Sequence, residues 1–384
     1  MKASKNKRKL IYASTIPQSL DTFWRGFLQQ QAKDNIVIAL SSPGEAMSRI
    51  AEREGVKTIE VPMERRISLR NDLVSLWNLV KVFRRERPYM VHSMTPKAGL
   101  LCMMAAWLTR VPVRVHTFTG LVFPTSTGLK RMVLMTTDRI TCSCATHIIP
   151  EGEGVKRDLL ENRITRKPIR VLGYGNVRGV DMAYYSRRPE VMQIADTLRD
   201  KSRFTFLFVG RIVRDKGIDE LVTAFTELHS RYPNARLILV GSYEDGIDPV
   251  SQTSKSTIDS HPAISAVGVK TGDELLAYYA ASDCFVLPSY REGFPNTVME
   301  AGALGLPCVV TDINGSNEII HNAENGLIVP SKNAAALCKA MEKVIVCRED
   351  TSLMASNARK MIADRFEQSF VRQCLTDFYR EIFK

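Results

Sequence analysis

The chain has 384 residues, of which 45% are hydrophobic and 24% charged. This length allows two domains of ordinary size, and the composition is that of a globular protein, which excludes a disordered or fibrous chain. The longest apolar run has 11 residues, 98–108; a membrane-spanning helix needs about 20, so we expect a buried helix there. The basic N-terminus is not followed by the apolar segment of a signal peptide, which predicts a cytoplasmic protein.

Basic residues are concentrated in the first half of the chain. Residues 1–190 contain 32 Lys and Arg against 16 Asp and Glu, whereas residues 191–384 contain 21 against 25. A basic surface of this kind is either simply solvated or attracts an anionic membrane or a pyrophosphate-bearing acceptor. Nucleic acid is the least favoured partner, because the aromatic–basic motifs of nucleic-acid-binding proteins are absent.

The cysteines and histidines show no pattern of a metal or redox site. The eight cysteines are scattered and the six histidines form no cluster. Cys142 and Cys144 are the one close pair, and their spacing matches neither a zinc knuckle nor a redox Cys-x-x-Cys motif. We therefore expect reduced thiols and no bound metal ion.

Short β-rich runs alternate with helical stretches in the first half of the chain. The expected strands are 10–13, 36–40, 57–61, 90–92, 113–116, 145–149 and 169–172. The expected helices between them are 19–32, 45–54, 70–87 and 97–109. This alternation predicts a parallel sheet with helices on both faces, as in a Rossmann-like domain. The loop after the first strand has no glycine, so a dinucleotide-binding fingerprint is absent.

Several segments of the first half carry candidate functional side chains. His116 ends an expected strand, and ligands of open α/β sheets bind at this edge, although a histidine buried at a strand end is equally consistent with the sequence. Lys97 could meet a phosphate, but a lysine in solvent is the favoured interpretation. Lys130, Arg131 and Arg139 lie among apolar residues, and Lys156 and Arg157 extend the basic character. This pattern is typical either of a helix that lies on a bilayer surface or of a surface helix that packs on the core.

Residues 173–181 contain three glycines that interrupt the periodicity and predict a domain boundary. Beyond it, the expected strands are 204–209, 236–240, 263–267, 284–287, 307–311 and 327–330. The expected helices are 218–231, 273–281, one from Asn296 or Thr297, a short one from Ser316, 334–346, 353–364 and 369–383. Residues 242–260 are interpreted as a polar excursion. The second half is therefore also expected to be Rossmann-like.

The turn from Gly210 to Gly217 joins a strand to a helix and contains Arg211 and Lys216. Both side chains could reach the same phosphates, arginine as a fork of donors and lysine as a point charge, and neutralise a leaving diphosphate. The alternative is an ordinary basic loop.

The stretch from Arg291 to Gly305 follows an apolar strand and leads into a helix. The N-terminus of that helix is an anion site, with Glu292 in the loop before it and Glu300 about one turn inside it. One carboxylate could accept from a sugar hydroxyl and the other from a ribose hydroxyl. Two alternatives remain open: Thr297 and Glu300 form a capping box, and Glu292 forms a solvated pair with Arg291.

The longer pattern resembles the signature of the retaining GT-B glycosyltransferases of family 4. It consists of Glu292-Gly-Phe-Pro295, seven residues between the two glutamates, and then Ala301-x-Ala-x-Gly-x-Pro-Cys-Val-Val-Thr-Asp312. Gly210-Arg-x-x-x-x-Lys-Gly217 resembles the donor-phosphate motif of this family, and Gly173 to Asp181 its interdomain linker. The resemblance covers roughly residues 120–384 well and 1–120 loosely.

The resemblance implies an α/β protein with two Rossmann-like domains facing across a cleft. Residues 1–178 would bind the acceptor, 179–366 the nucleotide sugar, and a helix in 367–384 would pack back on the first domain. Glu292 would act at the donor sugar, Glu300 at the ribose, His116 at a sugar hydroxyl, and Arg211 with Lys216 at the diphosphate. The remaining donor contacts implied are Gly210, Val269, Phe294, Pro295, Asn296 and Thr297.

The implied reaction moves a sugar from a nucleotide diphosphate sugar, with UDP favoured, to a lipid-diphosphate-linked glycan in the assembly of capsule, O-antigen or a related bacterial polysaccharide. We expect peripheral attachment at the inner face of the cell membrane and no cofactor or metal, since no Asp-x-Asp triad ends a strand. Three alternatives stay open: an epimerase of the same fold, a dehydrogenase and a non-catalytic binding module. Residues 1–120 offer no convincing carboxylates for the epimerase, and neither half has the Gly-x-Gly-x-x-Gly of the dehydrogenase.

Overall fold

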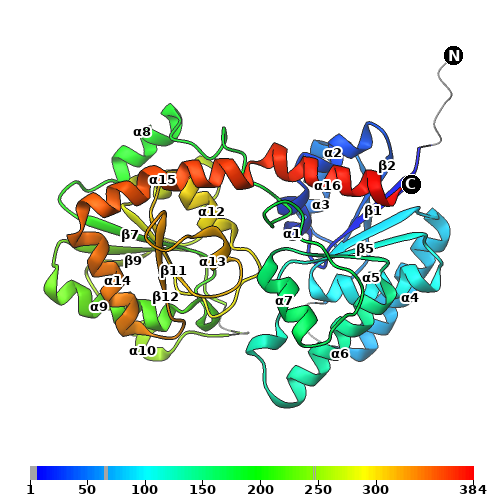
Figure 1. The fold of residues 1–384 in the computed structure, drawn as a ribbon, viewed down its shortest axis with the longest axis horizontal. Coiled ribbons are helices and arrows are strands. Elements are labelled where there is room, and N and C mark those ends of the chain that lie inside the picture. The colour runs from blue at the N-terminus through cyan, green and yellow to red at the C-terminus, as the bar shows by residue number, and fades with distance from the viewer. Residues whose placement is uncertain (1–6, 65–67, 245, 247) are drawn as a thin grey trace. The chain divides into compact units, whose positions relative to one another are not determined.

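The computed structural model describes residues 7–64, 68–244, 246 and 248–384. The chain divides into two compact units: unit 1 is Met1–Arg178 with Val371–Lys384, and unit 2 is Gly179–Phe370. The first division falls inside the glycine-rich stretch 173–181. The chain returns to unit 1 at Val371, four residues later than the sequence analysis placed it. Each unit is a parallel sheet flanked by helices (Figure 1).

The sheet of unit 1 has six parallel strands in the order β3-β2-β1-β4-β5-β6. The strands are β1 (Lys9–Ala13), β2 (Ile36–Ser41), β3 (Lys57–Glu60), β4 (Met90–Met94), β5 (Val113–Phe118) and β6 (His147–Pro150). The strand expected at 169–172 was predicted wrongly: the structure describes this segment, which places Leu172 in the core but forms no strand. Apolar residues alone do not make a strand where no neighbouring strand is available for pairing.

Helices cover both faces of this sheet. They are α1 (Pro17–Trp24), α2 (Phe27–Ala32), α3 (Glu45–Glu54), α4 (Leu69–Glu86), α5 (Pro96–Leu108), the short η1 (Phe123–Thr125), α6 (Gly128–Cys144), α7 (Glu153–Glu161) and α16 (Gln368–Ile382). Successive side chains of a strand point to opposite faces. Accordingly, Leu10 and Tyr12 pack with residues of α1, α2, α3 and α16, whereas Ile11 and Ala13 pack with residues of α4 and α5.

The last helix, α16, is anchored in unit 1 through Tyr379. This side chain is buried, and its hydroxyl lies 2.5 Å from Nδ1 of His92 in β4. The other ring nitrogen of His92 lies 2.7 Å from the Thr117 hydroxyl. Burial lowers the pKa of His92 to about 3, so the ring is neutral and its hydrogen bonds hold α16 to the sheet.

The sheet of unit 2 has six parallel strands in the order β12-β11-β10-β7-β8-β9. The strands are β7 (Phe204–Val209), β8 (Ala235–Val240), β9 (Ile264–Ala266), β10 (Cys284–Leu287), β11 (Cys308–Thr311) and β12 (Gly326–Val329). The helices are α8 (Pro189–Leu198), the short η2 (Arg214–Lys216), α9 (Ile218–Arg231), α10 (Gln252–Ser260), α11 (Gly272–Ala281), α12 (Asn296–Ala303), α13 (Ser316–Ile319), α14 (Ala334–Val346) and α15 (Arg348–Phe366). The sequence analysis missed α10, in the polar stretch 242–260.

Counted within each unit, both sheets have the strand order 3-2-1-4-5-6 of doubly wound α/β domains. The predicted α/β class with two Rossmann-like sheets is thus confirmed. In such sheets the strand order reverses between the first and fourth strands, and ligands bind beyond the carboxyl ends at that point. In unit 2 this switch point lies between β7 and β10.

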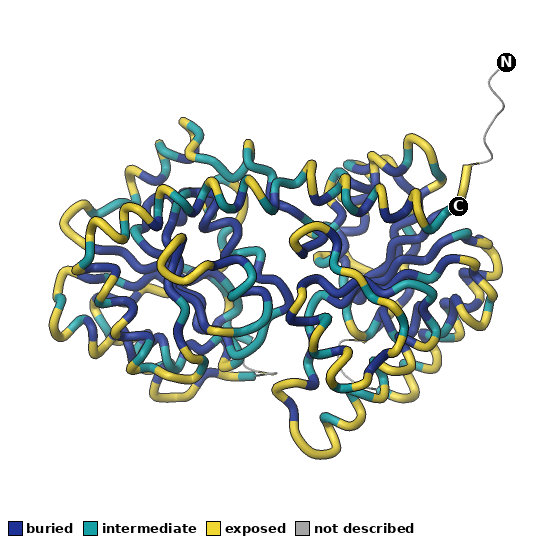
Figure 2. Tube along the Cα trace, viewed as in Figure 1, coloured by how far each residue is buried: buried dark blue, intermediate teal, exposed yellow. Residues whose placement is uncertain are grey.

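Burial follows this layered arrangement. The strands are buried and the outward faces of the helices are exposed (Figure 2). Among the described residues, no helix combines the length and the apolarity that crossing a lipid bilayer requires.

Candidate functional site

The candidate site is built by two loops at the switch point of unit 2. One loop joins β7 to α9 through η2, and the other joins β10 to α12. The Tyr290 N–H donates to the Asp215 carbonyl over 2.8 Å, and Arg291 pairs with the Asp215 carboxylate at 2.5 Å. The predicted succession of strand, loop and helix is present in both segments, and the fold brings the two together.

Gly217 allows the close approach of the two loops. Its φ of +70° is in the left-handed region, and a Cβ on it would lie 2.0 Å from the carbonyl oxygen of Pro288. Only glycine meets both conditions without displacing backbone. Gly217 therefore fixes the loop of Lys216 against the loop of Glu292.

Lys216 and Glu292 are in direct contact. Nζ of Lys216 forms an ion pair with Oε1 of Glu292, and the Ser289 hydroxyl donates to the same oxygen over 2.8 Å. Their side chains are 19% and 14% exposed, so both remain accessible at the edge of the sheet. The alternative pairing of Glu292 with Arg291 is not what the structure shows, since Arg291 pairs with Asp215.

Arg211 follows β7 but is held by a different carboxylate. Its Nη1 lies 2.8 Å from Oε2 of Glu244, which follows β8. The structure thus gives Arg211 and Lys216 separate partners and does not place them on one common group. The sequence analysis missed Glu244, because its pairing with Arg211 is a tertiary contact inside the stretch interpreted as a polar excursion.

Glu300 lies inside α12 and does not cap it. The helix begins at Asn296, so Glu300 is its fifth residue, whereas a capping box needs glutamate at the third. The Tyr185 hydroxyl donates to Oε1 over 2.9 Å and the Tyr279 hydroxyl to Oε2 over 3.3 Å. Glu300 is 6% exposed. The capping-box alternative was therefore wrong, and two tyrosines that the sequence analysis missed orient this carboxylate.

Burial raises the pKa of Tyr279 well above its ordinary value, and the neighbouring Glu300 carboxylate adds to the effect. Its phenol therefore keeps its proton and remains a donor to Glu300. A carboxylate held in this way presents its remaining lone pairs in a fixed direction.

The remaining predicted donor contacts lie at the same edge of the sheet with different exposures. Phe294 is 4% exposed and packs edge-on against Phe366 with ring centroids 5.3 Å apart, so its side chain anchors the loop in the core. Pro295 directly precedes α12, and Asn296 and Thr297 form its first two positions. Gly210 follows β7, and Val269, 64% exposed, lies in the loop after β9.

His116 belongs to unit 1 and lies within a strand. The sequence analysis placed it at the end of a strand, but β5 continues to Phe118. Its ring is 1% exposed, Nδ1 lies 2.9 Å from the Ser93 hydroxyl, and a Cβ on Gly99 would meet the ring at 2.4 Å. Burial lowers the pKa of His116 to about 3. The geometry supports the alternative of a buried structural histidine. Lys97 likewise pairs with Asp72 at 2.5 Å.

Within the part of the chain that the structure describes, no group of three or more His, Cys, Asp or Glu residues is placed to hold a metal ion. All eight cysteines are free thiols, as the sequence analysis expected. Positive groups at the site include Arg211, Lys216 and the N-terminus of α12. This arrangement is suited to binding an anion next to a carboxylate that accepts hydroxyl groups.

Two family models match the chain. The model "Glycosyl transferases group 1" matches residues 192–361, which include the site loops, and "Glycosyl transferase 4-like domain" matches residues 29–175. The capsular polysaccharide biosynthesis glycosyltransferase CapM of Staphylococcus aureus is 30% identical over 379 residues, 98% of each chain. A UDP-Gal:alpha-D-GlcNAc-diphosphoundecaprenol alpha-1,3-galactosyltransferase of Escherichia coli is 27% identical over 320 residues, 82% of this chain and 81% of the relative.

Solved structures agree with the fold. Anabaena HepE, crystallised with UDP-glucose, superposes with a TM-score of 0.80 at 16% identity, covering 97% of this chain and 99% of HepE. The two parallel sheets and this likeness establish the GT-B fold, and the matched family decides against the dehydrogenase, epimerase and non-catalytic alternatives. The chain belongs to the group 1 glycosyltransferases and is a GT-B glycosyltransferase related to enzymes of capsular and lipid-linked glycan assembly.

Proposed function

We propose that this glycosyltransferase moves a sugar from a UDP-sugar to a lipid-diphosphate-linked glycan, with retention at the anomeric carbon, in the assembly of capsule, O-antigen or a related bacterial polysaccharide. The observation that carries the donor half is the contact between Lys216 and Glu292 beyond the ends of β7 and β10. It joins a cation suited to a diphosphate to a carboxylate suited to a sugar hydroxyl.

The diphosphate of the donor is held by Lys216, Arg211 and the N-terminus of α12. The first N–H groups of a helix have no intrahelical acceptor, and the helix dipole adds positive potential there. Lys216 and Arg211 each exchange a carboxylate, Glu292 or Glu244, for phosphate oxygens. Charge that develops on the leaving UDP is thereby stabilised in place. The proposal includes no metal ion and no organic cofactor, because protein groups supply the positive charge.

Glu300 accepts from the ribose hydroxyls of the donor. Tyr185 and Tyr279 hold its carboxylate from two sides, so the acceptor oxygens are fixed before the donor arrives. The backbone around Val269, in the exposed loop after β9, contacts the base. Glu292 positions the transferred sugar, and its negative charge lies near the anomeric carbon, where positive charge develops in the transition state.

Unit 1 supplies a surface for the membrane that carries the acceptor. On α4, Leu69, Leu73, Val74 and Trp77 are each more than half exposed. Their spacing of three, four or eight residues places them along one helix face. Arg70, Lys81 and Arg84 of the same helix are exposed beside them.

Other helices of unit 1 also carry exposed apolar side chains: Trp107 and Leu108 of α5 and Leu129 and Met132 of α6. Basic groups beside exposed apolar side chains are suited to an anionic bilayer surface. The basic residues first considered for this role are partly engaged elsewhere: Arg131 donates to Asn162 and Lys156 pairs with Glu153. α4 therefore adds the stronger support for peripheral attachment at the inner face of the cell membrane.

The test offers labelled UDP- and GDP-sugars to the purified protein, with an undecaprenyl-diphosphate-linked acceptor or the same glycan without lipid. We expect label from one UDP-sugar in the lipid-extractable product. NMR of that product should show that the α-configuration of the donor is retained. Transfer only from a GDP-sugar, transfer only to the lipid-free glycan, or an inverted linkage would each contradict the corresponding part of the proposal.

A further inference from the structure

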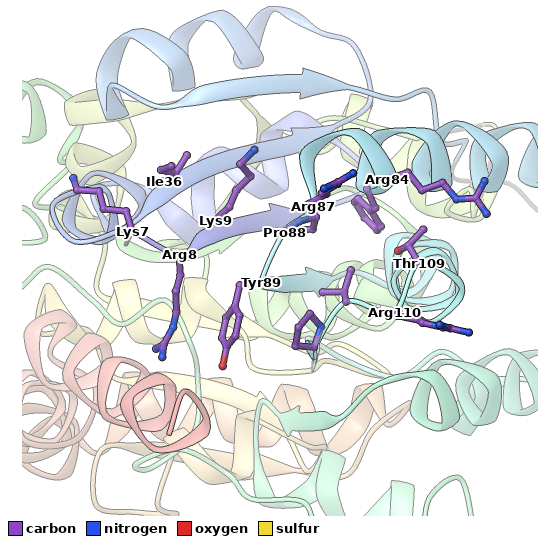
Figure 3. Close-up of a pocket in the computed structure, with 13 residues that line it drawn as sticks. Lys7, Arg8, Lys9, Ile36, Arg84, Arg87, Pro88, Tyr89, Thr109 and Arg110 are labelled. Carbon is purple, nitrogen blue, oxygen red and sulfur yellow. The ribbon is translucent and has the colours of Figure 1, made fainter. Parts of the chain in front are cut away.

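A basic cavity of about 870 Å³ lies at the amino-terminal edge of the sheet of unit 1. It opens where β1 and β2 begin and where α4 and α5 end (Figure 3). This is the end of the sheet opposite to the carboxyl ends of its strands. The lining residues are Lys7, Arg8, Lys9, Ile36, Phe83, Arg84, Arg87, Pro88, Tyr89, Thr109, Arg110, Val111 and Pro112. Six of them are basic and none is acidic.

Three of the six cations already have partners. Lys9 pairs with Glu86 at 3.1 Å, Arg8 donates to the Phe383 carbonyl at 2.9 Å, and Lys7 donates to the Lys33 carbonyl at 3.1 Å. The guanidinium of Arg8 also lies over the Tyr89 ring, 4.7 Å from its centroid. These contacts fix one wall of the cavity.

The other three cations, Arg84, Arg87 and Arg110, form no ion pair with any residue that the structure describes. All three are exposed, and Figure 3 shows Arg84 and Arg110 extending toward the same side. Glu86, the last residue of α4, is already shared by Lys9, Lys57 and Arg85. The cavity is thus lined by three guanidinium groups that have no carboxylate partner among the described residues.

A purely structural role does not require arginine at two of these positions. Arg87 caps the C-terminus of α4 with φ of 47°, and Arg110 follows the C-cap of α5 with φ of 57°. A cation there is stabilised by the helix dipole. A non-glycine residue in the left-handed region is strained by at least as much, a cost that glycine avoids. Arginine therefore brings no net gain to the fold at either position.

We infer that this cavity binds a phosphate-bearing anion, either a soluble diphosphate-type ligand or the headgroup of an anionic phospholipid. Arginine forks bind phosphate oxygens in pairs, and the volume is in the range of a small-ligand site. The half-buried ring of Tyr89 forms an additional wall. The site is separate from the proposed donor site, which lies in unit 2, and does not depend on the proposed function.

The test compares the unmodified protein with the double variant Arg87→Gly and Arg110→Gly. Inorganic pyrophosphate is titrated in the presence of saturating UDP, or on an Arg211→Ala, Lys216→Ala background, so that the donor site makes no contribution. The matched control is Arg163→Gly, because Arg163 is also exposed, follows the C-cap of α7 and has φ of 52°. Melting temperature and calorimetric affinity are measured for each protein.

We expect saturable pyrophosphate binding in the unmodified protein and in Arg163→Gly. Binding should be weakened more than about tenfold in the double variant, since it loses two charged hydrogen-bond donors. The melting temperature of the double variant without ligand stays equal or rises. Unchanged affinity in the double variant, equal loss in Arg163→Gly, or no saturable binding in the unmodified protein would overturn the inference.

A second arm identifies the source of the phosphate. Vesicles of phosphatidylglycerol are compared with vesicles of phosphatidylcholine, with and without pyrophosphate as competitor. The ligand is a lipid headgroup if the protein binds phosphatidylglycerol vesicles, pyrophosphate displaces it from them, and the double variant does not bind them. Pyrophosphate binding with vesicle binding unchanged in the double variant identifies a soluble anion.

Discussion

The two glutamates of the site carry the same charge but are held by different partners. Glu292 contacts Lys216 and Ser289 at the accessible edge of the sheet. Glu300 is nearly buried and is held by the hydroxyls of Tyr185 and Tyr279. In the proposed function, Glu292 therefore adjusts to the sugar as charge develops, whereas Glu300 is a fixed acceptor. Their removal should have different kinetic consequences.

Glu292→Gln keeps the shape of the side chain but removes its charge, and we expect kcat to fall on the order of 10²-fold with a smaller change in donor KM. Glu300→Gln replaces a carboxylate acceptor by a neutral one, and we expect donor KM to rise roughly tenfold, the effect of losing about 1.4 kcal/mol of binding. Steady-state kinetics with the preferred UDP-sugar separates the two. The control is Glu349→Gln, at an exposed position of α15. Equal losses at both site positions, matched by equal drops in melting temperature, would show a structural role instead.

Glu86 gives a pH dependence of stability. The hydrogen bond from Lys57 lowers the pKa of Glu86 to about 2, with Lys9 contributing. Because this value lies below the ordinary 4.5, the carboxylate stabilises the fold above about pH 4.5, and that contribution is lost as the pH falls toward 2. We expect Glu86→Gln to lower the free energy of unfolding by about 1.5–3 kcal/mol near neutral pH.

Urea unfolding of the unmodified protein and of Glu86→Gln across the acidic range measures the difference in their free energies of unfolding. This difference should narrow steadily as the pH falls below about 4.5. A difference that stays constant with pH would show that the ion pairs of Glu86 contribute nothing to stability.

Local sequence predicted where the site residues lie, but not how they pair. Gly210, Lys216 and Glu292 could be placed in loops after strands, because apolar runs and turn residues mark those boundaries. The contact of Lys216 with Glu292 joins positions 76 residues apart, and no local pattern encodes it. Glu244, Tyr185 and Tyr279 were missed for the same reason. His116 was placed at a strand end because Thr117 and Phe118 were not recognised as part of β5.

At the level of elements, α16 depends on one buried polar contact as well as on apolar packing. Tyr379→Phe removes the hydroxyl that bonds Nδ1 of His92 and leaves that buried nitrogen without this partner. We expect the free energy of unfolding to fall by about 1–3 kcal/mol, the cost of an unsatisfied buried polar group.

The matched control is Tyr89→Phe, whose ring packs against Phe383 at 5.5 Å in unit 1 and is only half-buried. Its hydroxyl should be nearly dispensable. Denaturant unfolding of both variants measures the two changes in the free energy of unfolding. A Tyr379→Phe variant as stable as the unmodified protein would assign the stability of α16 to packing alone.

Element boundaries were predicted well where the chain carries turn residues and less well elsewhere. α12 begins at Asn296, one of the two starts that the sequence analysis expected. That start places Glu300 too deep in the helix for a capping box, which the motif alone could not reveal. α15 begins at Arg348, five residues before the expected helix, because its first turn is polar and carries no apolar periodicity.

At the level of the whole molecule, the basic half of the chain and the exposed apolar face of α4 together predict binding to anionic bilayers. We expect co-sedimentation with liposomes that contain phosphatidylglycerol, weakened by salt because charges are screened beyond about 10 Å at 0.1 M. Leu73→Ser with Trp77→Ser should reduce binding severalfold by removing buried apolar area. Leu353→Ser, an equally exposed leucine of unit 2, is the control. Binding that is independent of lipid charge and unaffected by the α4 variant would show that this surface does not bind the membrane.

The central claim is that protein cations at the switch point of unit 2 hold the donor diphosphate. The most direct measurement is kcat/KM for sugar transfer by Lys216→Ala in the presence of EDTA, beside Lys339→Ala, which removes an exposed lysine of α14. The account predicts that the unmodified protein and Lys339→Ala stay active with EDTA, and that Lys216→Ala loses on the order of 10²-fold or more at an unchanged melting temperature. Full activity of Lys216→Ala, or complete loss of activity with EDTA that Mg²⁺ or Mn²⁺ restores, would contradict it.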